Sequence, residues 1–139
     1  MTSPMPTYTL YCDGAARGNP GPASAGAVLK NEKGEIVEEV SEYLGETTNN
    51  QAEYQALLFG LKKAIKHKVK NLEIFLDSEL VVKQLNKLYK VKHPALIPLF
   101  QEVTKLLQEI PNFKIQHIPR EKNEEADLLA NRAIDWNRM

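Results

Sequence analysis

The chain has 139 residues, 42% of them hydrophobic and 26% charged, and its 18 basic and 18 acidic residues give no net charge. This length and composition indicate one globular domain and show no sign of a disordered chain or a fibre. No apolar run approaches the roughly 20 residues of a membrane-spanning helix, and the N-terminus lacks the basic and apolar stretches of a signal peptide. Cys12 is the single cysteine, which excludes an internal disulfide and favours a reducing compartment, the cytosol. We interpret residues 1–6 as a flexible N-terminal tail and 7–139 as a single domain.

The first third of the chain predicts three antiparallel strands. Alternating letters rich in β-formers predict the first over residues 7–13, ending at Gly14. Glycine and proline make residues 14–22 an expected loop. The second strand is predicted over residues 24–30, and a hairpin turn at 31–34 leads into a third strand that runs to about Tyr43.

The rest of the chain predicts helices alternating with strands. Thr48 and Gln51 have the spacing of a capping box, so a helix is expected to begin there and to run to about His67. Beyond it we expect a strand over 72–77, helices over 78–89 and 94–109 with Pro98 as a point of bending, a strand over 113–118, and a helix from about Asn123. The order βββ-α-β-α-α-β-α predicts an α/β fold with a five-stranded mixed sheet flanked by helices.

Four of the acidic residues occupy unusual positions. Asp13 and Asp77 end strands, where open α/β sheets place ligand sites. Glu53 shares the apolar stripe of the first long helix, and Asp127 lies one turn into the last helix, beside its apolar stripe. Taken singly, each has an ordinary interpretation as a turn former, a cap or an acid near a helix N-terminus. Gathered in one place they would repel one another and need cations, and an all-oxygen site suits Mg²⁺ or Mn²⁺.

Four segments resemble, in order, the motifs of type 1 ribonucleases H. They are residues 13–22 (DGAARGNPGP), 47–53 (TTNNQAE), 77–80 (DSEL) and 119–130 (PREKNEEADLLA). One DG or DS would carry no information, whereas four motifs in the order and spacing of the family are a specific signal. The resemblance covers about residues 7–136, and the ribonuclease H-like fold that it implies agrees with the element order.

The resemblance implies a metal-dependent endonuclease that hydrolyses the RNA strand of RNA–DNA hybrids and leaves 5′-phosphate and 3′-hydroxyl ends. The metal-binding acids of the family match Asp13, Glu53, Asp77 and Asp127, which would hold two Mg²⁺ or Mn²⁺ ions. By analogy Asp13 bridges both ions, Asp127 helps to hold the ion on the water side, and the other two acids hold the ion on the leaving-group side. We expect a monomer with an RNA–DNA hybrid as substrate and no membrane partner.

Substrate contacts carry over from the same motifs. Asn19 and Asn50 match residues that touch base edges and sugars in the minor groove, and Thr48 matches a contact to a DNA phosphate. Gly14 and Gly18 would let the backbone approach the strand closely. Taken singly, Asn19 is equally a turn residue and Asn50 a helix N-terminal residue.

Three features depart from the common pattern of the family. The loop histidine of many bacterial members aligns near Arg120; arginine occurs there in a related subgroup, and it cannot act as a general base but can bind phosphate or assist product release. His117 lies nearby, at the end of a predicted strand, as a weaker candidate for a catalytic part. Glu79 stands where many members have glutamine, and its charge disfavours a close nucleic-acid contact. The basic protrusion of some bacterial members is missing between Tyr89 and Pro98.

Other features have two interpretations or a structural one. The lysines over residues 62–70 and 83–92 are either a solvated helix face or a surface that follows phosphates. We interpret Tyr54 and Trp136 as packing residues and Cys12 as a small core residue.

Four alternatives remain beside the ribonuclease. A non-catalytic nucleic-acid-binding module would not need all four acids. A 3′–5′ exonuclease of this fold would carry an Asp-x-Glu pair on the first strand, where this chain has Asp13-Gly14-Ala15. A detached reverse-transcriptase domain is less simple than a stand-alone protein, which we expect here, and an α/β domain with scattered acids would not keep four motifs in order.

Overall fold

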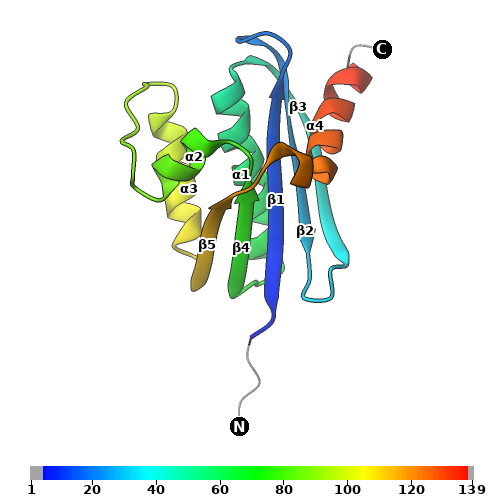
Figure 1. The fold of residues 1–139 in the computed structure, drawn as a ribbon, viewed down its shortest axis with the longest axis vertical. Coiled ribbons are helices and arrows are strands. Elements are labelled where there is room, and N and C mark those ends of the chain that lie inside the picture. The colour runs from blue at the N-terminus through cyan, green and yellow to red at the C-terminus, as the bar shows by residue number, and fades with distance from the viewer. Residues whose placement is uncertain (1–4, 138–139) are drawn as a thin grey trace.

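The computed structural model describes residues 5–137, so residues 1–4 of the predicted tail lie outside the described residues. The elements in chain order are β1 (Thr7–Ala16), β2 (Gly21–Lys30), β3 (Ile36–Thr47), α1 (Asn49–Lys66), β4 (Asn71–Leu76), α2 (Glu79–Leu85), α3 (Ile97–Leu107), β5 (Asn112–His117), the 3-10 turn η1 (Arg120–Lys122) and α4 (Glu124–Asn137). The sheet order is β3-β2-β1-β4-β5, with antiparallel pairs among the first three strands of the chain and parallel pairs from β1 to β4 and from β4 to β5 (Figure 1). The predicted element order and mixed sheet are confirmed. Within residues 5–137, no helix is long and apolar enough to cross a membrane.

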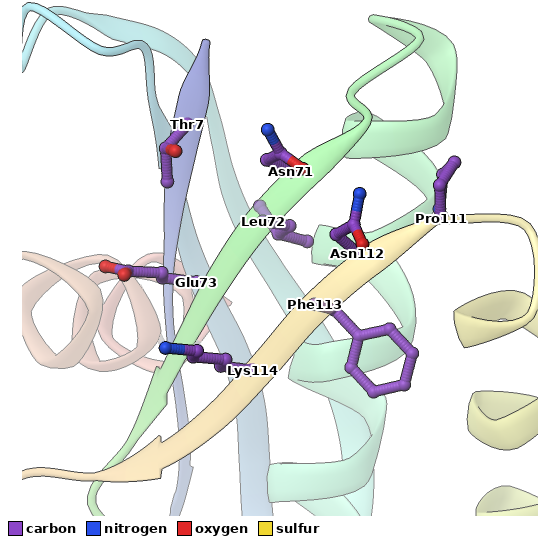
Figure 2. A pocket seen from close by; sticks show the side chains of 8 residues that line it. All are labelled: Thr7, Asn71, Leu72, Glu73, Pro111, Asn112, Phe113 and Lys114. Atoms are coloured by element: carbon purple, nitrogen blue, oxygen red, sulfur yellow. The ribbon is translucent and has the colours of Figure 1, made fainter. Parts of the chain in front are cut away.

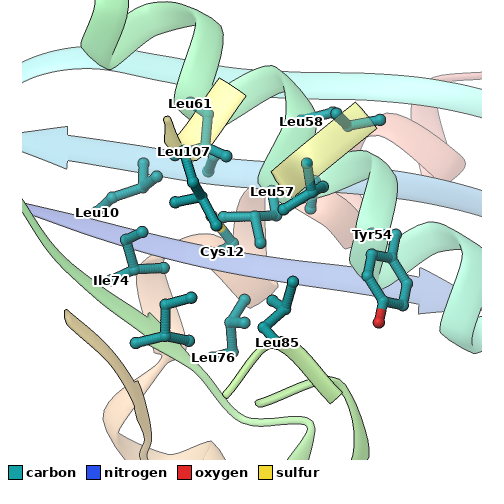
Figure 3. Close-up of a cluster of buried hydrophobic side chains, with 14 of the residues drawn as sticks. Leu10, Cys12, Tyr54, Leu57, Leu58, Leu61, Ile74, Leu76, Leu85 and Leu107 are labelled. Atoms are coloured by element: carbon teal, nitrogen blue, oxygen red, sulfur yellow. The ribbon is translucent and has the colours of Figure 1, made fainter. Parts of the chain in front are cut away.

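Helices cover both faces of the sheet. Helix α1 packs on one face together with α2 and α3, and α4 packs on the other face over β1, β2 and β3 (Figure 1). The core lies between α1 and the central strands, where leucines of α1 such as Leu57 and Leu61 meet Leu10 and Ile74 (Figure 3). This rigid centre fixes the position of α1 relative to the ends of β1 and β4.

The three predicted packing residues have different outcomes. Tyr54 and Cys12 are fully buried, as expected, and burial raises the pKa of the Cys12 thiol well above its usual range. Trp136 is 68% exposed, so the packing interpretation of this residue was wrong. Trp136 lies at the end of α4, beyond Ile134, which is the last buried residue of that helix. Its ring centroid lies 5.5 Å from the Cζ atom of the Arg132 guanidinium.

The prediction that the first strand ends at Gly14 was wrong. Strand β1 continues to Ala16 because it forms a hairpin with β2, in which Gly14 pairs with Ala25. The glycine meets a packing requirement: a Cβ there would overlap the backbone of Ala52 and Glu53 in α1. The expected loop shrinks to residues 17–20, which include a cis peptide bond before Pro20.

The helices after β4 are shorter than predicted. Helix α2 ends at Leu85, because Lys87 has a left-handed backbone conformation (φ 63°) that no helix continues through. Helix α3 begins at Ile97 and places Pro98 in its first turn. A proline there removes no helical hydrogen bond, so it starts the helix and gives no reason for a bend. Between the two helices, turns at residues 86–87 and 94–96 flank an irregular stretch of chain.

Candidate metal centre

The strand register brings Asp13 and Asp77 together. The parallel pairing of β1 with β4 ends at the pair Cys12 and Leu76, and the next residue of each chain segment is an aspartate. The prediction that Asp13 ends its strand was therefore wrong. Strand β1 continues to Ala16, and Asp13 lies at the point where the pairing of β1 with β4 stops. Asp13 also pairs with Gly26 of β2, and a Cβ on Gly26 would overlap the backbone of α4. Because paired residues of neighbouring strands point to the same face, the Asp13 side chain lies on the α4 face of the sheet.

Glu53 reaches the same place from α1. Glu53 is 3% exposed, and its Oε1 accepts a hydrogen bond of 2.9 Å from the backbone N–H of Gly14. Its Oε2 is buried and has no hydrogen-bond partner among residues 5–137. One oxygen is thus fixed by the strand while the other remains available to a ligand.

The three carboxylates form a cluster that is unfavourable when fully ionised. Oxygen atoms of Asp13, Glu53 and Asp77 lie within 4.8 Å of one another. Burial, and then the negative charges of Glu53 and Asp77, raise the pKa of Asp13 above its usual range. Burial also raises the pKa of Glu53, against hydrogen bonds that lower it. A divalent cation would relieve this repulsion and would satisfy the unpartnered Oε2, so the residues present fit Mg²⁺ or Mn²⁺.

Asp127 completes the lining of a pocket of about 230 Å³ that also contains the three acids and Arg120. The Asn131 amide, one turn further along α4, donates to Asp127 Oδ1 over 3.2 Å. Arg120 Nη2 lies 3.6 Å from the same oxygen, and the Arg120 side chain is 78% exposed. Such an exposed ion pair contributes little free energy, so the guanidinium could turn to an approaching anion.

His117 and Glu79 lie outside this pocket lining in the described part of the chain. His117 is exposed at the end of β5. Glu79 begins α2 and pairs with Lys83 over 2.7 Å, which lowers the pKa of Glu79. The ion pair offsets part of the charge that we expected to disfavour nucleic acid.

The predicted substrate contacts gather at the N-terminus of α1. Thr48 caps this helix: its hydroxyl accepts from the Gln51 backbone N–H over 3.2 Å, and the Gln51 side chain completes the predicted capping box. Asn19 Oδ1 accepts from the backbone N–H of Asn49 over 3.0 Å, which holds the 17–20 loop against the helix. Asn50 follows in the first turn, and Gly14 lines the pocket itself. Contact between these residues and a nucleic acid stays a prediction.

Sequence reasoning missed several residues around the pocket. Asn49, Arg17 and Asn131 line it. Arg17 pairs with Asp135 over 2.6 Å and reaches Asn131 Oδ1 over 3.3 Å, which joins the β1–β2 hairpin to α4. Asn131 had a usable signal, because it lies one helical turn beyond Asp127, whereas the Arg17 contacts join residues more than 100 positions apart.

A second pocket, of about 440 Å³, lies at the opposite end of the strands, where β1, β4 and β5 begin (Figure 2). Its lining contains one acid, Glu73, and none of the predicted site residues. The chemistry of an acidic site therefore belongs to the smaller pocket.

The sequence is similar to a known protein family and to named ribonucleases H. The family model described as reverse transcriptase-like matches residues 11–133. Ribonuclease HI of Halobacterium salinarum is 44% identical over 125 residues, which are 90% of this chain and 63% of that protein. The chain thus spans less than two thirds of the length of that relative. A ribonuclease H of Desulforamulus reducens is 35% identical over 137 residues, covering 88% of this chain and 84% of that protein.

The fold is also that of solved structures. A ribonuclease H1 isolated from compost by a metagenomic approach superimposes with a TM-score of 0.91 at 45% identity, covering 97% of this chain and all of that one. The same protein in complex with an RNA/DNA hybrid gives a TM-score of 0.89 at 44% identity, with 95% and 99% of the two chains covered.

Proposed function

The chain belongs to the reverse transcriptase-like family that includes ribonucleases H, and from this premise we propose that it is a metal-dependent endonuclease that hydrolyses the RNA strand of RNA–DNA hybrids. One observation carries the proposal: β1, α1, β4 and α4 each bring one acid to the same pocket. The relative that has been solved with an RNA/DNA hybrid supports the choice of substrate.

The four acids would hold Mg²⁺ or Mn²⁺, two ions per site. When bound, the cations supply the positive charge that allows water to attack a phosphodiester and the leaving oxygen to depart. The Gly14 N–H keeps Glu53 Oε1 in place, which would leave Oε2 to hold a cation. Asn131 in the same way holds Asp127 Oδ1.

The remaining residues would orient the hybrid. Arg120, exposed at the pocket rim, would bind the scissile phosphate or the product. Thr48, Asn19 and Asn50 lie at the positively polarised N-terminus of α1, where a DNA phosphate and the wide minor groove of a hybrid would approach. Water adds to phosphorus and the bond from phosphorus to the 3′-oxygen breaks. That oxygen takes up a proton, and the products are a 3′-hydroxyl and a 5′-phosphate.

The test uses an RNA–DNA hybrid whose RNA strand carries a 5′-label, together with DNA–DNA, RNA–RNA and single-stranded RNA. Each is incubated with Mg²⁺, Mn²⁺ or EDTA. We expect internal cuts in hybrid RNA with either metal and none with EDTA. Products that shorten only from one end would support the exonuclease instead, and a hybrid that is bound but intact with every metal would support a binding module. The monomeric state and the cytosolic location also stay predictions, and size-exclusion chromatography tests the first.

A further inference from the structure

Asn123 connects three of the elements that carry the acids. It lies between η1 and α4 and is 1% exposed. Its amide nitrogen donates to the backbone oxygen of Cys12 over 2.8 Å and to Asp77 Oδ2 over 3.1 Å. Its own backbone oxygen accepts from the N–H of Asp127 over 3.1 Å. One residue thus holds the position before Asp13, the carboxylate of Asp77 and the turn that presents Asp127.

The orientation of this amide follows from its partners. A backbone carbonyl can only accept, so the NH₂ group must face Cys12, and its second hydrogen then points to Asp77. The Asn123 Oδ1 atom is buried and has no partner among residues 5–137. A buried acceptor without a partner costs free energy, so the two donated bonds have to offset this cost.

We propose that Asn123 is a positioning residue that holds the Asp77 carboxylate in the geometry that a divalent cation requires. The inference rests on the proposed function, because it assigns a role toward the cation of that site. The hydrogen bond to Oδ2 fixes the rotation of the carboxylate. An amide is suited to this task because it is neutral: it adds no charge to the acid cluster and does not compete with a cation, as a lysine or an arginine would.

A purely structural role makes a different prediction. If Asn123 only ties the turn to β1, its loss lowers the stability of the fold and leaves metal affinity unchanged. The chain offers a matched control for this case. Asn86, at the end of α2, donates its amide to the backbone oxygen of Ile115 over 3.1 Å and so makes the same kind of tie away from the acids.

The experiment is a calorimetric titration of the full chain with Mn²⁺ alone, without nucleic acid. We expect Asn123→Ala to bind Mn²⁺ roughly 10- to 100-fold more weakly than the wild type, while Asn86→Ala stays within about twofold. A folded Asn123→Ala variant with wild-type affinity would overturn the inference. If that variant does not fold, Asn123→Ser decides, because its hydroxyl cannot replace both bonds: weaker binding supports the inference and unchanged binding overturns it.

The same variants in the hybrid assay separate this inference from the proposed function. We expect the activity of Asn123→Ala to return as the Mn²⁺ concentration is raised, with the KM for hybrid unchanged. A wild type that binds Mn²⁺ but cuts no hybrid would contradict the proposed function and leave the effect of Asn123 on metal affinity measurable. A wild type that binds no Mn²⁺ would overturn the inference as well.

Discussion

Replacing Asp13 by asparagine should stabilise the protein in the absence of metal. Two unit charges 4.8 Å apart repel by about 3.5 kcal/mol at an effective dielectric constant of about 20, and Asp13 has two such neighbours, Glu53 and Asp77. The full sum is not reached, because the folded protein can bind a proton instead. Protonating a carboxyl group with an ordinary pKa of 3.8 at pH 7 costs about 4.4 kcal/mol, because each pH unit above the pKa costs about 1.36 kcal/mol. We therefore expect Asp13→Asn to raise the free energy of unfolding by about 2–4 kcal/mol.

The pH dependence of this gain has a defined sign. The pKa of Asp13 is higher in the folded than in the unfolded protein, so the folded state retains its proton to higher pH. The stability contributed by this group is present below pH 4 and declines as the pH rises toward the folded-state pKa. The advantage of Asp13→Asn should therefore be larger at pH 8 than at pH 5.

The assay is urea unfolding followed by circular dichroism in EDTA at pH 5, 7 and 8. Glu102→Gln, which neutralises an exposed acid of α3, is the control and should change the stability by less than about 0.5 kcal/mol. Saturating Mg²⁺ should shrink the gain, because the cation binds the wild type and offsets the repulsion. A variant no more stable than the wild type, or a gain that does not depend on pH, would refute the electrostatic reasoning.

Three further predictions concern the frame of the site. Thr48→Ala removes the cap of α1 and should lower the free energy of unfolding by about 1 kcal/mol, whereas Thr48→Ser should lower it much less; equal urea midpoints for the two would contradict the capping role. Gly26→Ala should lower the free energy of unfolding by more than about 2 kcal/mol in the same assay, because the added Cβ would overlap the α4 backbone. Gly45→Ala should lower it by roughly 1 kcal/mol, because Gly45 has a φ of 79° but nothing lies within 4 Å of the added Cβ. Arg120→Ala should slow hybrid cleavage about tenfold with little change in stability, and an unaltered rate would exclude a phosphate contact by this exposed side chain.

Local patterns predicted those parts of the fold that depend on neighbouring residues. The capping box of Thr48 and Gln51 placed the start of α1 correctly, and the apolar run after residue 71 identified β4. The predicted strand end at Gly14 was wrong because glycine interrupts strands on average, while here the pairing with Ala25 continues the strand and the approach of α1 requires glycine. Lys87 ends α2 through a backbone conformation that its residue type does not signal.

The four acids were singled out by their positions in the chain, motif resemblance assigned them to a metal site, and their convergence follows from topology. Asp13 and Asp77 adjoin because two parallel strands end their pairing one residue before each. The bonds of Asn123 could not be predicted in this way, since its partners Cys12 and Asp77 lie 111 and 46 positions away. No local rule indicates which asparagine of a motif is buried and which is exposed.

The most direct test of the central claim is the rate of hybrid RNA cleavage by Glu53→Gln in Mg²⁺, beside the wild type and Glu102→Gln. Glu53 is buried and its Oε2 has no hydrogen-bond partner within residues 5–137, so a site that works through a bound cation depends on this charge. We expect the wild type and Glu102→Gln to cut at the same rate, and Glu53→Gln to cut roughly 100-fold more slowly or not at all. Cleavage by Glu53→Gln at the wild-type rate would contradict the assignment of this carboxylate cluster as the catalytic metal site.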